Sequence, residues 1–253
     1  MPGLTRQEAE TYLYYAMEIG EAMLVSGAEV GRVEDSIRRI CMAYGAKRVD
    51  VFTITSSIVT TVYGEEFLSC TQTRRVSSMK NDLSMLDGLN RLSREICERK
   101  LTSDEIASRL ERIRSGPQYS FGVQVMLYAF ISASFCIFFG GTWEDMLVSA
   151  GIGVCLKYAD AFLQRGSSNP LLIALLCAMV GGLLSNLAVF AGLGDSADSI
   201  SIGNIMLLIP GMAFTNSIRD IFSKDMITGV VRFVEAVVLA IVIALGFTFT
   251  NFL

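Results

Sequence analysis

The sequence contains no histidine among its 253 residues. This absence excludes catalytic sites that use an imidazole base and metal sites with histidine ligands. The six cysteines are far apart and form no C-x-x-C pair, which indicates reduced, small hydrophobic residues rather than a disulfide or zinc framework. An apolar run near the N-terminus is also missing, so we expect no cleaved signal peptide. We expect no metal, no other cofactor and no catalytic residues.

Charge is the other scarce component, and it is unevenly distributed. Charged residues make up 18% of the chain, below the roughly 25% typical of soluble domains. Residues 1–118 hold 16 of the 21 Lys and Arg residues and 17 of the 25 Asp and Glu residues, whereas residues 119–253 hold only 5 and 8. This asymmetry predicts a soluble domain over residues 1–118, followed by a membrane domain over residues 119–253. No nucleic-acid partner is expected.

The first domain has the pattern of a small α+β domain. Apolar residues recur at helical spacing over residues 5–25 and 29–44, and glycines follow both stretches. Residues 48–73 are rich in Val, Ile, Thr, Tyr and Phe, which predicts two or three antiparallel strands with a turn at Gly64 and Glu65. The helical pattern returns over residues 78–100 and 103–114, and Thr102 with Glu105 predicts a capping box at the start of the last helix.

The second domain contains five apolar stretches near the roughly 20 residues needed to cross a bilayer. They cover residues 120–140, 145–164, 170–193, 199–216 and 228–251. Basic residues gather before the first stretch and in the connectors after the second and fourth, whereas the other two connectors carry only acidic residues. Because basic residues stay in the cytoplasm, we expect a multi-pass protein of the bacterial inner membrane. Its N-terminal α+β domain would be cytoplasmic, its all-α membrane domain would have five transmembrane helices, and its C-terminus would lie outside.

Two pairs of ionisable residues lie within these spans, each pair three residues apart: Lys157 with Asp160, and Arg232 with Glu235. In the expected orientation both pairs lie about 6–10 Å from the cytoplasmic ends of their helices, and Pro210 breaks the fourth span in the same layer. Ionisable groups within a span are costly unless they are paired or hydrated, and a broken helix with charges at one depth is typical of a transporter site. Two plainer interpretations stay open. Lys157 and Asp160 can simply neutralise each other, and Pro210 can be a packing kink.

Two stretches of the sequence resemble a known family. The segments "LVSGAEVGRVEDSIRRICMAYG" (24–45) and "PGMAFTNSIRDIFSKDMITGVVRFVEAVVLAIVIALG" (210–246) are similar to the N-terminal part of the threonine/serine exporter family. The residues that fall on the family pattern are Gly27, Glu29, Arg32, Glu34, Pro210, Gly211, Asn216, Arg219, Asp220, Asp225, Arg232 and Glu235.

The resemblance implies an exporter. Full-length members of that family fuse two membrane halves and export threonine and serine, driven by the proton gradient. Split members pair this half with a smaller membrane subunit and are similar to a proposed succinate exporter. We expect the split type: a subunit of a secondary-active, proton-coupled exporter of small carboxylates. Its cargo would be threonine and serine or a dicarboxylate such as succinate, and its partner a second small integral membrane protein in a homo- or hetero-oligomer.

The expected roles of individual residues follow from this hypothesis. An arginine can hold a carboxylate with two parallel donors, and burial favours the protonated form of a carboxyl group that carries a coupling proton. The expected substrate-binding residues are Arg232, Glu235, Arg219, Asn216, Pro210 and Gly211, and the candidates for the coupling proton are Glu235 and Asp160. Structural or gating roles are expected for Asp220, Asp225, Lys157, Gly27, Glu29, Arg32 and Glu34.

Two other classes of function stay open. In the first, the chain is a membrane-anchored sensor or scaffold whose soluble domain binds a ligand or a partner. A polar pocket in that domain, with no cavity among the spans, would favour it. In the second, the chain is a membrane enzyme, for which Asp160 with Glu235 is the one carboxylate pair that could meet.

Overall fold

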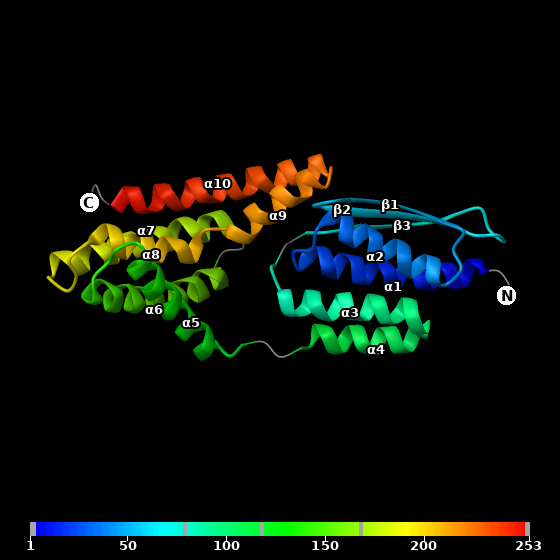
Figure 1. Ribbon diagram of the computed structural model, residues 1–253, viewed down its shortest axis with the longest axis horizontal. Coiled ribbons are helices and arrows are strands. Elements are labelled where there is room, and N and C mark those ends of the chain that lie inside the picture. Colours follow the sequence, from blue (N-terminus) through cyan, green and yellow to red (C-terminus); the bar gives the residue numbers. More distant parts are fainter. Residues whose placement is uncertain (1–3, 78–79, 117–118, 167–168, 251–253) are drawn as a thin grey trace. The chain divides into compact units, whose positions relative to one another are not determined.

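The computed structural model describes residues 4–77, 80–116, 119–166 and 169–250. It is mostly helical, with one three-stranded sheet near the N-terminus (Figure 1). The chain forms two compact units, Met1–Pro117 with Met212–Val234 and Gln118–Gly211 with Glu235–Leu253, which we call unit 1 and unit 2. The division of the sequence into domains 1–118 and 119–253 stays a prediction.

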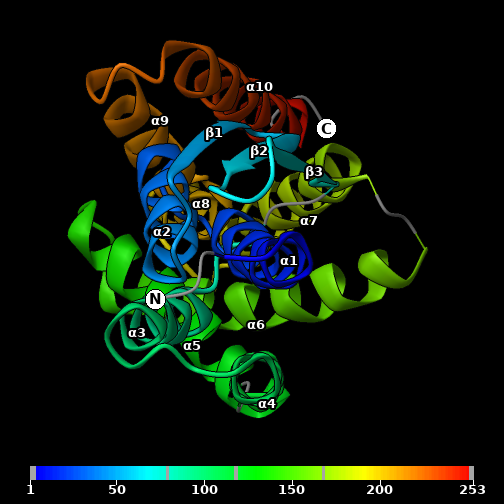
Figure 2. The ribbon, with the colours of Figure 1, turned by 90° about the vertical axis from the view of Figure 1, so that its right-hand side faces the viewer.

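Unit 1 is built in layers around two central helices. The sheet lies on one side of these helices and two further helices lie on the other (Figures 1 and 2). The central helices are α1 (Arg6–Val25) and α2 (Val30–Ala43), the strands are β1 (Arg48–Ile54), β2 (Ser57–Tyr63) and β3 (Cys70–Arg75), and the outer helices are α3 (Leu83–Arg99) and α4 (Ser103–Arg114). The core of the unit forms where these layers meet, around fully buried side chains such as Leu13, Met17 and Ile37.

Local capping explains where the helices of unit 1 begin. The predicted capping box is confirmed, because Thr102 and Glu105 bond reciprocally across the first turn of α4. The start of α3 was predicted too early, at residue 78. The carboxylate of Asp82 accepts the main-chain N–H of Met85 at 2.9 Å, and the helix begins at Leu83. Residues 78 and 79 lie outside the described part of the chain.

The sheet has the order β1-β2-β3, with both pairs antiparallel. Alternate residues of β2 are buried, as expected for a strand with one face on a core. The predicted turn at Gly64 and Glu65 lies between β2 and β3. A second, tighter turn at Thr55 and Ser56 connects β1 to β2, with Ile54 paired to Ser57.

The predicted membrane spans lie in unit 2, except that the segment Met212–Val234 belongs to unit 1. Among the described residues, four helices are long and apolar enough to cross a membrane: α5 (Phe121–Phe138), α6 (Trp143–Gly166), α7 (Pro170–Phe190) and α10 (Met226–Thr250). A fifth crossing results if the bent pair α8 (Ala197–Leu208) and α9 (Gly211–Phe222) is one broken span. The prediction of a polytopic helical membrane protein is therefore confirmed for four of the five expected spans. The fifth span, and the side on which each terminus lies, stay predictions.

The helix break predicted at Pro210 in the expected fourth span is confirmed. Helix α8 ends with Ile209 in an extended conformation, and α9 begins after Pro210. Proline has no N–H and disfavours a helical conformation in the preceding residue, which accounts for the interruption.

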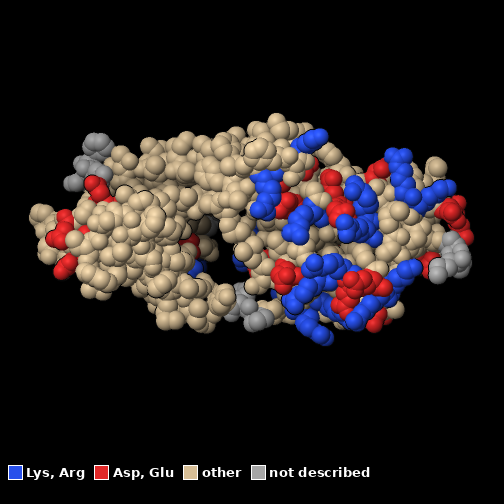
Figure 3. All heavy atoms as spheres, in the orientation of Figure 1, with Lys and Arg blue, Asp and Glu red and all other residues tan. Residues whose placement is uncertain are grey.

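The helices of unit 2 pack closely at small and polar residues. A Cβ on Gly153 of α6 would lie 2.8 Å from the carbonyl oxygen of Tyr128 on α5, so only glycine permits this approach. Nearby, the buried Ser132 hydroxyl lies 2.7 Å from both the Ser149 hydroxyl and the Asn204 amide oxygen, which ties α5, α6 and α8 together. Charged side chains are sparse over the face of unit 2 that Figure 3 presents, and dense over unit 1.

Candidate functional site

A buried ion pair lies between α9 and the start of α10, within unit 1. Nη1 of Arg232 lies 2.6 Å from Oδ2 of Asp220, and the two side chains are only 5% and 0% exposed. Two charges withdrawn from water are stable together only if good geometry and further hydrogen bonds offset their desolvation. Stability of this pair therefore requires hydrogen bonds from the groups around it.

Main-chain groups of the turn between α1 and α2 supply those further bonds. Oδ1 of Asp220 accepts a long hydrogen bond of 3.4 Å from the N–H of Val30, the first residue of α2. Both terminal nitrogens of Arg232 donate to the carbonyl of Ala28, also at 3.4 Å. Glu29, which precedes α2, forms no side-chain cap. Asp220 thus brings, from a distant part of the sequence, the negative charge that a helix N-terminus favours.

Two more contacts link α9 to the same turn. Arg219 pairs with Glu29 at 2.6 Å, in a partly solvated position where the two side chains are 56% and 21% exposed. The amide nitrogen of Asn216 donates to the carbonyl of Gly27 at 3.2 Å. Exposed ion pairs contribute little to stability, so we expect the Arg219–Glu29 pair to stabilise this turn less than the buried Asp220–Arg232 pair does. We use the name turn cluster for the following set: Gly27, Ala28, Glu29, Val30, Asn216, Arg219, Asp220 and Arg232.

The turn itself requires glycine at its tightest point. Gly27 has a φ of +93°, in the left-handed region that side chains disfavour. A Cβ at this position would also lie 2.6 Å from Oδ1 of Asn81. Glycine at this position therefore allows the carbonyls of Gly27 and Ala28 to face α9 and α10 without strain.

Two acidic residues lie beside the turn cluster. The carboxylate of Glu34 accepts the N–H of Thr53 at 2.8 Å, which ties α2 to β1. Burial raises the pKa of Glu34 above its ordinary value, and the nearby charge of Asp225 acts in the same direction. Asp225 faces the first turn of α2, because its Oδ2 lies 3.7 Å from where a Cβ on Gly31 would be.

The structure thus brings residues from both ends of the sequence pattern to one place, but it does not pair Arg232 with Glu235. The guanidinium of Arg232 faces Asp220. Glu235 is exposed on α10, and its side chain forms neither an ion pair nor a hydrogen bond within the described ranges. Pro210 and Gly211 lie at the break between α8 and α9. The substrate-binding and gating roles expected for these residues stay predictions.

A second polar site lies within unit 2. Asp160 and Gln164 of α6 line a cavity of about 440 Å³ whose other walls are apolar residues of α7, α8 and α10. Oδ1 of Asp160 accepts a 2.7 Å bond from Gln164, and its Oδ2 lies 3.4 Å from Nζ of Lys157. Lys157 and Asp160 are only 12% and 18% exposed, and Nζ of Lys157 also lies 5.0 Å from the centre of the Tyr128 ring. The cavity is within the size range of small-molecule sites.

Some components of these sites were missed by sequence reasoning. The main-chain groups of Ala28 and Val30 carry no side-chain signal. Ser132 and Ser149, the two serines that hydrogen-bond with Asn204, were also missed. Among the described residues, no group of three or more Cys, Asp or Glu side chains is arranged to hold a metal ion.

Comparison with known proteins assigns the chain to a family. The family model of the threonine/serine exporter, ThrE, matches residues 14–253, which include both the turn cluster and the cavity of unit 2. The chain belongs to the threonine/serine exporter family. The resemblance of segments 24–45 and 210–246 to this family is thereby confirmed.

Three relatives illustrate the range of the threonine/serine exporter family. The chain is 24% identical to the threonine/serine exporter of Corynebacterium glutamicum, over 87% of this chain and 46% of that protein. It is also 24% identical to the "Probable succinate transporter subunit YjjP" of Klebsiella aerogenes, over 88% and 86% of the two chains. It is 27% identical to the pheromone-regulated membrane protein 10 of Pichia sorbitophila, over 66% and 17%. The chain thus spans less than half the length of the first and third of these relatives. No solved structure matches this chain.

Proposed function

We propose that this chain is one subunit of a secondary exporter that moves small carboxylates across the inner membrane of a bacterium. Membership of the exporter family and the four or five candidate spans support an export function. The observation that carries the proposal is the cavity of unit 2, where a carboxylate and an amide face an opening among apolar helices. Ionisable groups within a membrane span are costly unless they are paired or hydrated. Asp160 is paired with Lys157 and also faces this cavity, and transporters place their solute sites at such positions among helices.

The charges around this cavity favour an amino acid over a dicarboxylate as the cargo. Asp160 attracts the ammonium group of threonine or serine and repels the second carboxylate of succinate. Lys157 is not part of the cavity lining, but it pairs with Asp160 at 3.4 Å and so offers a complementary charge for the single carboxylate of an amino acid.

Asp160 is also the better candidate for carrying a coupling proton. It lines the cavity and has two polar partners, Lys157 and Gln164, whose bonds depend on its charge. Glu235 is exposed on α10 instead. A charge on the outer surface of a membrane helix is costly against lipid, so we assign Glu235 to a contact with the second membrane subunit.

For the turn cluster we propose a gating role rather than direct substrate binding. A substrate carboxylate could reach Arg232 only by displacing Asp220, which already occupies its guanidinium at 2.6 Å. Helix α9 follows the break at Pro210, and its Asn216, Arg219 and Asp220 all contact the α1–α2 turn. The cluster therefore connects the broken segment to the N-terminal helices.

A second candidate function is a membrane-anchored sensor, and one observation favours it. Unit 1 contains a polar groove of about 490 Å³ between α2 and α3. A sensor whose spans serve only as an anchor does not require a charged residue such as Asp160 in a cavity among those spans, so we rank export first.

Transport in reconstituted vesicles tests the proposal. The chain would be incorporated into liposomes with and without the proposed second membrane subunit, and exchange of labelled threonine, serine and succinate would be measured with and without a pH gradient. We expect exchange of at least one of these only with both subunits, threonine and serine exceeding succinate. An absence of exchange for all three with both subunits present would contradict an export function, whereas faster exchange of succinate would contradict the amino-acid preference.

A further inference from the structure

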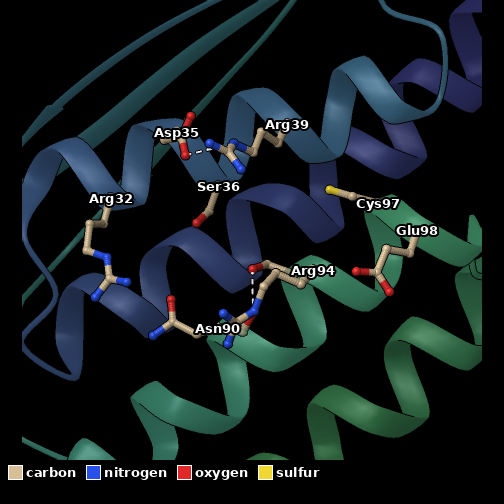
Figure 4. A pocket seen from close by; sticks show the side chains of 9 residues that line it. Arg32, Asp35, Ser36, Arg39, Asn90, Arg94, Cys97 and Glu98 are labelled. Atoms are coloured by element: carbon tan, nitrogen blue, oxygen red, sulfur yellow. Dashed lines mark hydrogen bonds and ion pairs between the residues drawn. The ribbon is translucent and has the colours of Figure 1, made fainter.

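We propose that the groove between α2 and α3 of unit 1 is a binding site for a small dianion, either a dicarboxylate or inorganic phosphate. The groove is separate from the turn cluster and from the cavity of unit 2. It has a volume of about 490 Å³, and its lining includes three arginines, two serines and an asparagine (Figure 4). This volume is within the range of small-molecule sites, but the lining is mostly polar rather than apolar.

Positive charge gathers in the lining of the groove. Arg39 is paired with Asp35 of the same helix at 2.8 Å. In contrast, Arg32 of α2 and Arg94 of α3 have no carboxylate within ion-pair distance in the described part of the chain, although most arginines of unit 1 do. Including Asp35 and Glu98, the lining carries a net charge of +1, from three arginines and two carboxylates.

Hydrogen-bond donors gather at one end of the groove. In Figure 4, Arg32 extends from α2 towards α3, and the amide of Asn90 extends from α3 towards Arg32. Ser36 points into the gap between them, and Arg94 lies beside Asn90. Glu98 lies at the opposite end of the groove, next to Cys97. One end of the groove thus presents two guanidinium groups, an amide and a hydroxyl, all of which can donate to oxygen atoms.

The chemistry of these donors selects the ligand class. A guanidinium binds carboxylate and phosphate oxygens through two parallel bonds. Two guanidinium groups on facing helices suit an anion that carries two negative charges, which can engage both at once. A single monovalent anion would leave one arginine unpaired. The plainer alternative is that both arginines form a solvated surface with no ligand.

The groove lies close in sequence to the turn cluster of unit 1, so a bound ligand would affect that cluster. Arg32 lies two residues after Val30, whose N–H is held by Asp220 of the turn cluster. A ligand that joins Arg32 to α3 would fix the first turn of α2, on which that cluster is built. Any effect on export rests on the proposed function, whereas binding to the groove does not.

Binding to the full chain in detergent micelles tests the site. Isothermal titration at low ionic strength, where exposed charges are least screened, would use succinate and sodium phosphate as separate probes, with sodium chloride as the reference. The same titrations with an Asp160→Asn variant would remove any contribution from the cavity of unit 2. We expect saturable binding of succinate, phosphate or both, unchanged by Asp160→Asn. The stronger probe identifies the source as a carboxylate or a phosphate.

Variants of the two arginines decide whether the groove is responsible. Arg32→Gln and Arg94→Gln should each weaken binding by roughly tenfold, because each removes one charge-assisted contact. Arg38→Gln is the matched control, since Arg38 is exposed on α2 but does not line the groove. Thermal melting of each variant would check that it is folded. The proposal is overturned if neither probe binds saturably, or if Arg38→Gln weakens binding as much as the two groove variants.

Discussion

The buried pair of Asp220 and Arg232 should be the strongest single contribution to the stability of the turn cluster. Arg232→Met removes the positive partner and leaves the carboxylate of Asp220, which is 0% exposed, with only the long bond from Val30. Loss of one partner of a buried ion pair typically costs about 3–5 kcal/mol, because the other charge is left without compensation. We expect a loss of that size in the local stability of the α1–α2 turn.

Replacement of both residues separates the ion pair from simple packing. The double variant Asp220→Leu with Arg232→Met exchanges two charges for apolar groups of similar size, which is often neutral in a buried site. The lost contact to the start of α2 should still cost about 1 kcal/mol. The double variant should therefore be more stable than Arg232→Met alone, a strongly non-additive result.

Hydrogen–deuterium exchange of peptides covering residues 26–34 in detergent micelles measures this local stability. A loss of 3 kcal/mol corresponds to an increase of more than about 100-fold in the exchange rate. Arg219→Met is the control, because its pair with Glu29 is partly solvated and should contribute less than about 1 kcal/mol. The single variant Asp220→Leu completes the comparison. The proposed role of the pair is wrong if Arg232→Met changes exchange no more than Arg219→Met, or if the double variant loses as much stability as Asp220→Leu and Arg232→Met lose together.

Three further predictions concern other positions. Gly27→Ala should cost at least about 1–2 kcal/mol, because of its φ of +93°. Adding Asn81→Ala should recover only part of this loss, and full recovery in a thermal melt would show that strain is absent. Gly153→Ala should cost about 1–3 kcal/mol, since its Cβ would meet the Tyr128 carbonyl at 2.8 Å, whereas Gly151→Ala has open space around it and should cost little. Fluorescence of Trp143, the single tryptophan, can follow the unfolding of both variants. Equal effects of the two substitutions would refute the close approach. The pKa of Glu34 is raised above its ordinary value of 4.5, so the folded state binds a proton at Glu34 more tightly than the unfolded state does. The contribution of Glu34 to stability therefore falls as the pH rises above about 4.5 towards the raised pKa. Glu34→Gln should flatten this part of the pH–stability curve, and an unchanged slope would contradict the assignment.

The local parts of the fold were predictable from sequence because their causes are local. Thr102 and Glu105 fix the start of α4 through bonds three residues apart, and Pro210 breaks the fourth span wherever the surrounding helices lie. The turn at Thr55 and Ser56 was not predicted, because neither residue carries the glycine, asparagine or proline signal of a tight hairpin.

The partner of Arg232 could not be read from local spacing. Three residues along a helix place Glu235 near Arg232, which favoured that pair. The actual partner is Asp220, twelve residues earlier, brought into contact by the reversal of the chain at residues 223–225. The contact with Ala28 and Val30 spans about two hundred residues and uses main-chain groups, for which no side-chain pattern exists. The family pattern contained all the charged members of the turn cluster but not their pairing.

The central claim is that the cavity of unit 2, which Asp160 and Gln164 line, is the solute path. Threonine exchange by variants of Asp160 tests this claim most directly. The assay would compare the natural chain, Asp160→Asn and Asp198→Asn, each reconstituted with the second subunit; Asp198 is an exposed carboxylate in the first turn of α8 and does not line the cavity. We predict that Asp160→Asn reduces threonine exchange at least tenfold and removes its dependence on the pH gradient, while Asp198→Asn stays near the natural rate. Normal, gradient-dependent exchange by a folded Asp160→Asn protein would contradict the account.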